Sequence, residues 1–164
     1  MNFQDSKIIN MNKYKKNWNI ADFETMGWHD SKIYSINFDM DNHKLLFDID
    51  YIFEWNQNDK AENYTFLISP ASLIFNNVWN LKIDIEPYQN IEILNISRDN
   101  PNKPKNAEFI GKDIEWDWTI ETICGNITLK SVGFEQIIRE EPIISNTQSL
   151  NMNIRKEIRK HYQI

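Results

Sequence analysis

A stretch of strict apolar alternation, residues 45–55, constrains the fold of this chain more than any other feature. Successive side chains of a strand point to opposite faces, so alternation puts the apolar ones together on one face, whereas a helix would scatter them. The opposite face is mostly acidic and carries Leu46, Asp48, Asp50, Ile52 and Glu54. We therefore expect a long strand with one buried side and one side in water. The apolar set is Leu45, Phe47, Ile49, Tyr51, Phe53 and Trp55.

The preceding segment, residues 32–40, alternates in the same way and predicts a hairpin partner. A two-residue loop at Asn42-His43 would set Met40 opposite Leu45. The same register keeps apolar side chains opposite one another along the whole hairpin, which is how strand register is normally fixed.

Several shorter strands are predicted after this hairpin, and residues 98–106 are predicted to be an exposed loop. About eight to ten strands at short spacing indicate a mainly β protein, either an antiparallel β-sandwich or a strongly curved sheet. The further strands are expected within residues 64–68, 73–78, 81–86, 91–96, 114–120 and 127–134.

A short N-terminal helix is expected after Asn19, which is a good N-cap residue. Asp22 follows three positions later, and Gly27 is suited to end the helix after about two turns. Residues 1–18 are predicted to be a polar leader, and residues 19–164 a single β-rich domain.

The C-terminal segment leaves two interpretations open. Leu150, Ile154 and Ile158 recur every fourth residue beside several basic residues, which favours a short amphipathic helix. Asn151 and Asn153 are weak helix formers, so a basic tail without helical structure is the alternative.

The composition indicates which kind of partner and which cellular compartment to expect. Net charge is −6, which disfavours nucleic acid as a ligand and suits a basic protein partner. Cys124 is the single cysteine and cannot form an internal disulfide, which predicts a reducing, cytoplasmic location. No apolar run is long enough for a transmembrane helix, and residues 1–16 lack the apolar core of a signal peptide. We expect no membrane association.

The segment Trp28-His29-Asp30, which leads into the first hairpin, contains the main candidate site residues. If His29 and Asp30 join Asp48 and Asp50 across the hairpin, they supply one imidazole and three carboxylates, a set that suits a divalent metal ion. The Asp48/Asp50 spacing also permits a carboxylate-pair hydrolase. The alternative is that Asp30 caps the strand entry and that the Asp48/Asp50 face is merely solvated. No phosphate-binding loop is present in the sequence, and we expect no cofactor.

Four segments carry a family resemblance: Met26–Ser31 (MGWHDS), Asp48–Trp55 (DIDYIFEW), Ile68–Val78 (ISPASLIFNNV) and Leu81–Asp84 (LKID). They resemble an uncharacterised family of small bacterial proteins common in Bacteroidetes-type genomes. The similarity spans residues 18–150. It implies a bacterial source and genomic company with toxin–antitoxin or polymorphic-toxin loci, where small acidic immunity proteins are common. It assigns no catalytic residue.

Three functions follow as hypotheses. The first is a non-enzymatic protein-binding domain, one form of which is an immunity-type protein that neutralises a basic toxin. The second is a metal-dependent or carboxylate-based hydrolase centred on His29, Asp30, Asp48 and Asp50, and the third is a structural interaction module. An exposed strand edge also leaves a homodimer open. The predicted binding residues are Trp28, His29, Asp30, Asp48 and Asp50.

Overall fold

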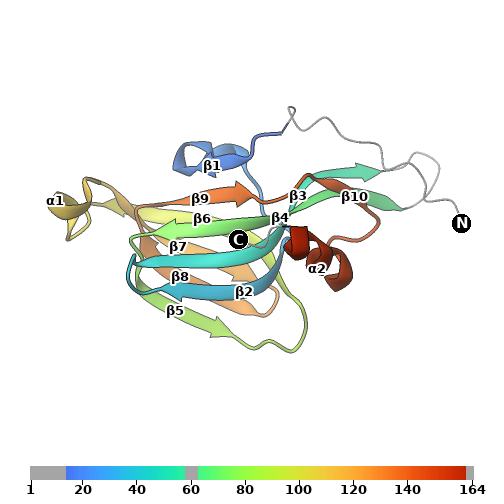
Figure 1. Cartoon of the computed structure of the whole chain (residues 1–164). Coiled ribbons are helices and arrows are strands. Elements are labelled where there is room, and N and C mark those ends of the chain that lie inside the picture. The colour runs from blue at the N-terminus through green and yellow to red at the C-terminus, as the bar shows by residue number, and fades with distance from the viewer. Residues whose placement is uncertain (1–13, 58–62, 162–164) are drawn as a thin grey trace, which may run out of the picture.

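The computed structural model describes residues 14–57 and 63–161, and this part of the chain is mainly β (Figure 1). Ten strands form a single antiparallel sheet in the order β1-β9-β4-β3-β2-β6-β7-β8-β5, and β10 pairs with β4. The strands are β1 (Asn17–Asn19), β2 (Lys32–Asp39), β3 (Lys44–Gln57), β4 (Tyr64–Asn76), β5 (Trp79–Ile85), β6 (Ile91–Asn102), β7 (Glu115–Thr122), β8 (Gly125–Ser131), β9 (Gly133–Ile138) and β10 (Ile143–Ser145).

Helical structure is limited to short pieces: η2 (Ile20–Thr25), α1 (Ala107–Ile110) and α2 (Met152–His161). The predicted N-terminal helix is present as η2, and Asn19 caps it together with Asp22 in a reciprocal capping box. It is a 3₁₀ helix that ends before Gly27. None of the helices in residues 14–57 and 63–161 is long and apolar enough to cross a membrane.

The predicted first hairpin is confirmed as β2 and β3, but its register is wrong by two residues. Phe38, and not Met40, lies opposite Leu45, because the loop runs from Met40 to His43. Within that loop the Asn42 backbone N–H donates to the Asp39 carboxylate at 3.1 Å, which stabilises the wider turn. A shift of two residues keeps every side chain on its predicted face, so Phe47, Ile49 and Tyr51 are buried as expected.

Two β-bulges change which side chains face the core. The first lies between Ile33 and Ser35 and turns Tyr34 out of the predicted apolar face. The second lies between Ile52 and Glu54 on β3. Beyond it Trp55, predicted to be buried, is exposed. Ile52, predicted on the wet face, is buried in a second small apolar cluster with Phe66, Ile68 and Leu150.

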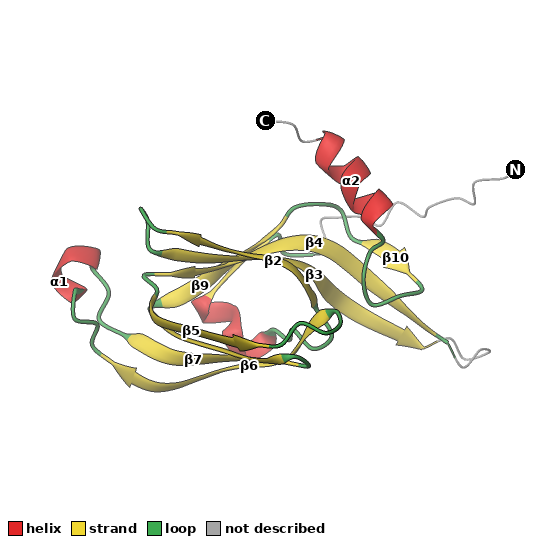
Figure 2. Ribbon diagram, turned by 90° about the horizontal axis from the view of Figure 1, so that it is seen from below, coloured by secondary structure: helices red, strands yellow, loops and turns green. Residues whose placement is uncertain are grey.

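Strands from the two halves of the sheet share one apolar core. Phe75 on β4 and Trp118 on β7 have ring centroids 5.2 Å apart, although β3, β2 and β6 separate them in the sheet order. Figure 2 shows β2, β3, β4 and β9 in one layer and β5, β6 and β7 in another. The predicted class, mainly β with antiparallel strands, is confirmed. The strands form one sheet that is neither closed nor strongly curled, so it is neither of the two finer forms expected, a β-sandwich of two sheets or a strongly curved sheet.

Three predictions about individual segments can be compared with the structure. Residues 98–106 are not a loop throughout, because β6 continues to Asn102 and pairs with β7 as far as Glu115. Most of the predicted leader, residues 1–18, lies outside the described residues, but Asn17 and Trp18 pair with β9. The predicted C-terminal helix is confirmed as α2.

Candidate functional site

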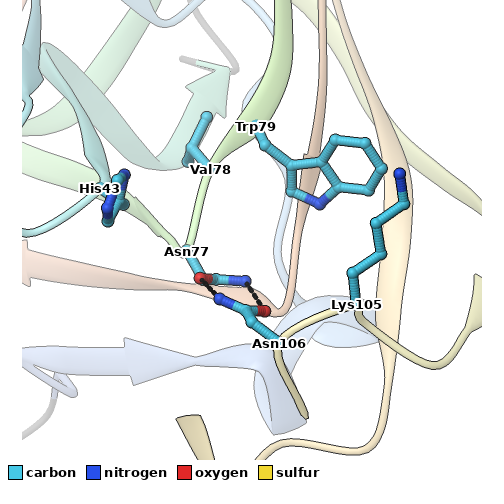
Figure 3. Close-up of a pocket in the computed structure, with 6 residues that line it drawn as sticks. All are labelled: His43, Asn77, Val78, Trp79, Lys105 and Asn106. Carbon is cyan, nitrogen blue, oxygen red and sulfur yellow. Dashed lines mark hydrogen bonds between the residues drawn. The ribbon is translucent and has the colours of Figure 1, made fainter. Parts of the chain in front are cut away.

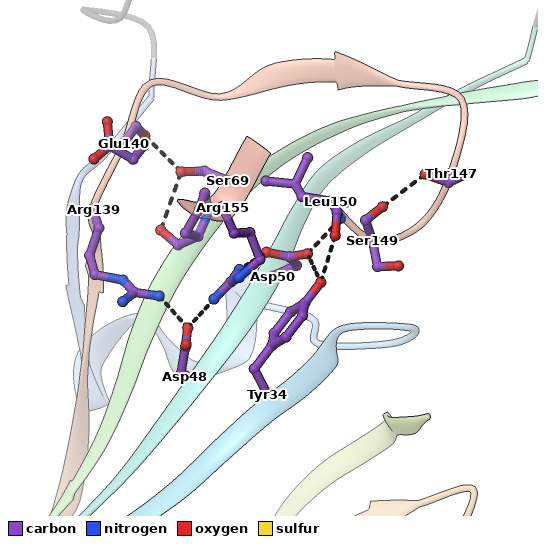
Figure 4. Close-up of polar contacts among 11 residues, drawn as sticks. Tyr34, Asp48, Asp50, Ser69, Arg139, Glu140, Thr147, Ser149, Leu150 and Arg155 are labelled. Carbon is purple, nitrogen blue, oxygen red and sulfur yellow. Dashed lines mark hydrogen bonds and ion pairs between the residues drawn. The ribbon is translucent and has the colours of Figure 1, made fainter. Parts of the chain in front are cut away.

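Asp48 and Asp50, both predicted as binding residues, lie beneath the C-terminal segment and do not face open water (Figure 4). Asp50 is 0% exposed, and only 12% of the Asp48 side chain is accessible. The expectation of a solvated acidic face is therefore wrong at these two positions. The reason is that residues 148–155 cross this face of β3 and bring a cation with them.

The cation is Arg155, on the first turn of α2, whose guanidinium pairs with both Asp48 and Asp50. Arg139, which follows β9, pairs with Asp48 as well. Asp50 also accepts hydrogen bonds from the Tyr34 hydroxyl and the Leu150 backbone N–H, each at 2.7 Å. A buried charge needs such full pairing to be tolerated, and this network supplies it.

Tyr34 completes the network from β2. Its hydroxyl bonds to Asp50 and lies 2.9 Å from the Leu150 carbonyl oxygen, and the Arg155 guanidinium carbon sits 3.7 Å from its ring centre. Burial raises the pKa of the Tyr34 hydroxyl, and its hydrogen bond to Asp50 raises that pKa further. The hydroxyl therefore stays neutral and acts as a donor that joins β2, β3 and the C-terminal segment.

The other predicted residues, Trp28-His29-Asp30, have different surroundings. Trp28 is buried, donates from Nε1 to Gln136 Oε1 at 2.7 Å and packs edge-on against Phe134. His29 Nδ1 lies 3.0 Å from Asp30 Oδ1, and Gln148 donates to the same carboxylate at 2.7 Å. Across residues 14–57 and 63–161, no group of three or more His, Cys, Asp or Glu side chains could hold a metal ion.

Trp28 and His29 also border a surface hollow of about 380 Å³ between η2 and β6. Leu94, on the β6 side, is an exposed apolar residue at its edge, and Glu24 lies at the η2 side. The hollow brings an imidazole, a carboxylate and apolar surface together.

A second hollow, of about 260 Å³, lies where the β2–β3, β4–β5 and β6–α1 loops meet (Figure 3). Its shape is fixed by a reciprocal amide pair: Asn77 Nδ2 donates to Asn106 Oδ1 at 3.2 Å and Asn106 Nδ2 to Asn77 Oδ1 at 2.9 Å. The Val78 backbone N–H donates to the His43 carbonyl oxygen at 2.8 Å and ties the first loop to the second. The lining residues are His43, Asn77, Val78, Trp79, Lys105 and Asn106.

Trp79 is the aromatic wall of this second hollow. Its Nε1 donates at 2.7 Å to the carboxylate of buried Glu115, which fixes the ring in place. The ammonium groups of Lys105 and Lys130 lie 5.1 and 5.4 Å from the ring centre, within cation–π range. Sequence analysis missed this site because its residues come from three loops and the start of β5, and they form no motif along the chain.

Helix α1 projects from the same end of the sheet (Figure 1). Its N-cap residue is Asn106 of the amide pair, and Gly111 ends it in a left-handed conformation with φ 63°. Phe109 on this single turn is 91% exposed. We call the surface made by His43, Trp79, Lys105, Asn106 and α1 the loop end.

Comparison of the chain with family models, with curated proteins and with solved structures found no match. The resemblance to small bacterial proteins stays a prediction.

Proposed function

We propose that this chain is a non-enzymatic protein-binding domain that contacts its partner through the loop end. The observation that carries the proposal is Phe109, a large apolar side chain that is 91% exposed on a projecting helical turn. Aromatic residues of this kind are enriched among the few side chains that dominate the energy of protein–protein interfaces. Full burial of a phenylalanine contributes about 1.5–3 kcal/mol.

The position of α1 is fixed before any partner binds. Asn106 is the residue directly before α1, and its amide pair with Asn77 joins α1 to the β4–β5 loop. A surface that is already ordered loses less conformational entropy on binding than a flexible loop does. Next to it, the hollow beside Trp79 provides a concave site for a side chain of the partner.

We propose further that the partner is basic. The net charge of −6 favours encounter with a protein of opposite charge and disfavours nucleic acid. An immunity-type protein that neutralises a basic toxin fits this description. On that proposal the loop end supplies the apolar anchor, and the charge of the whole domain accelerates association.

The test compares Phe109→Ala with Tyr88→Ala, which removes another exposed aromatic ring (72% exposed) from the β5–β6 loop. The wild-type protein is used to isolate a partner from the source organism, and the partner is then purified and titrated with all three proteins. Phe109→Ala should weaken binding at least about tenfold, the expected loss for one buried anchor, while Tyr88→Ala should bind like wild type.

The salt dependence tests the charge of the partner separately. A basic partner should associate several-fold more slowly when ionic strength is raised from about 50 to 500 mM, because screening removes the attraction. Equal affinities for Phe109→Ala and wild type would refute the role of the loop end. An acidic partner, or an association rate independent of salt, would refute the electrostatic part.

A further inference from the structure

Strand β5 ends the sheet and has an open edge. It pairs with β8 and with no other strand among those the structure describes. Ile83, in the middle of β5, is an apolar residue that is 52% exposed. An open edge with exposed apolar side chains is a template for pairing with another strand.

The backbone groups that face this edge can be assigned from the ladder between β5 and β8. Lys82 lies opposite Thr128 and Asp84 opposite Asn126. Beyond Ile85 the Glu86 backbone N–H still donates to the Cys124 carbonyl oxygen, at 2.9 Å. Backbone groups alternate in direction along an antiparallel strand, so Lys82 and Asp84 bond toward β8. Ile83 and Ile85 therefore direct their N–H and C=O groups to the open edge.

The side chains of β5 are divided by the same alternation. Ile83 lies opposite Ile127, which is fully buried, so Ile83 is on the core side of the sheet. Lys82 and Asp84 project from the other side and are exposed. The edge thus offers a cation and an anion two residues apart, with an apolar residue between them on the opposite face.

We propose that β5 pairs with β5 of a second copy of this chain, antiparallel and with Ile83 on the two-fold axis. In that register Lys82 lies opposite Asp84 of the second copy, and Asp84 lies opposite its Lys82. The two Ile83 residues exchange both backbone hydrogen bonds, and each side chain covers the exposed apolar surface of the other. On the same face, Leu81 contacts Ile85 of the second copy. Two-fold symmetric pairing therefore gives the edge backbone groups hydrogen-bond partners, buries exposed apolar surface and pairs both charges.

The occupant is a second copy because the sequence of β5 is complementary to itself. A lysine on an edge strand normally opposes pairing with other strands. Here the two-fold register places Lys82 of the second copy opposite Asp84, so the lysine meets an opposite charge. The contact is a single short strand pair and is smaller than a stable interface, so the dimer is expected to dissociate in the micromolar range.

Sedimentation equilibrium of the full chain over a wide concentration range tests this pairing. Asp84→Lys places lysine opposite lysine twice, and Lys82→Asp places aspartate opposite aspartate twice. Each should raise the dissociation constant at least about tenfold, because like charges directly opposite are destabilising. The double variant K82D/D84K restores both pairs with exchanged charges and should dimerise like wild type. Lys112→Asp, an exposed site in the α1–β7 loop, has the same change in net charge as Lys82→Asp and is its matched control.

Recovery in the double variant separates a broken interface from a misfolded chain. The proposal is overturned if the wild-type protein is monomeric at the highest concentration it tolerates. It is also overturned if a dimer forms that is indifferent to both single substitutions, because another surface would then hold it. A dimer that both single variants lose and the double variant does not regain would refute the assigned register.

Discussion

Replacing Arg155 by methionine is expected to detach α2 from the sheet. Arg155 is 3% exposed and is the cation that pairs with fully buried Asp50. Methionine keeps an unbranched apolar stem but removes the charge. Asp50 would then remain buried with the Tyr34 and Leu150 hydrogen bonds and without its ion pair.

The size of the stability loss depends on which partners Asp48 and Asp50 retain in the Arg155→Met variant. Removing one partner of a buried ion pair costs about 3–5 kcal/mol. Asp50 keeps two hydrogen bonds and Asp48 keeps Arg139, so we expect a loss near 3 kcal/mol, at the lower end. The remaining apolar attachment of the segment includes buried Leu150, which contributes about 1.5–3 kcal/mol. Because these terms are similar, residues 148–161 should open locally while the sheet stays folded.

Hydrogen exchange followed by mass spectrometry distinguishes local opening from global unfolding. Amides of α2 should exchange roughly a hundredfold faster in Arg155→Met, which corresponds to about 3 kcal/mol, while β3 and β4 keep their protection. Lys156→Met, which removes an exposed charge from the next residue, is the matched control and should leave exchange unchanged.

A second variant tests the cause. If the effect comes from an uncompensated carboxylate, Asp50→Leu combined with Arg155→Met should recover part of the lost protection, because replacing a buried ion pair by apolar residues is often neutral. Exchange in α2 that is the same for wild type, Arg155→Met and Lys156→Met would refute the reasoning and show that the ion pairs do not hold the helix.

Two further predictions concern stability. Gly125→Ala should cost roughly 3 kcal/mol in chemical denaturation, because the added Cβ would lie 2.1 Å from the Asp84 carbonyl oxygen at a φ of +130°, whereas Gly27→Ala, with no atom within 4 Å, should be nearly neutral. The hydrogen bond from Lys130 lowers the pKa of Asp117, and one from Asn100 assists. The stability that ionised Asp117 contributes is fully present above its ordinary pKa of 3.8, and it is lost as pH falls through the lowered pKa of the folded state. Thermal melts from neutral pH to about pH 2 should therefore show a smaller loss of stability below pH 4 for Asp117→Asn than for wild type.

Features that depend on near neighbours in the chain could be predicted from the sequence. The alternation in residues 45–55 needs only the geometry of one strand, and it identified β3 and its buried face. The start of η2 needs only Asn19 and Asp22, which cap one another across one turn. The register of the first hairpin was wrong because a loop that is two residues longer, both of them on the β2 side, preserves the same faces, so the apolar pattern alone cannot distinguish the two registers.

The surroundings of the site residues depend on contacts between distant parts of the chain. Asp48 and Asp50 were selected from their spacing, but Arg155, which pairs with Asp50, lies 105 positions away. The apolar stripe of the C-terminal helix was predicted to include Leu150 and Ile154; Leu150 is buried, but Ile154 is exposed and Arg155 is buried instead. Electrostatic pairing with the acidic strand therefore decided which face of α2 contacts the sheet.

The sequence by itself determined that this is a mainly β protein with one long half-buried strand, because the period of apolar residues is a local property of the backbone. Only the tertiary structure decided that the acidic face of that strand is covered, that three loops enclose the hollow beside Trp79, and that β5 is left at an edge. These outcomes depend on strand order and on bulges, which bring together residues that have no fixed spacing in the chain.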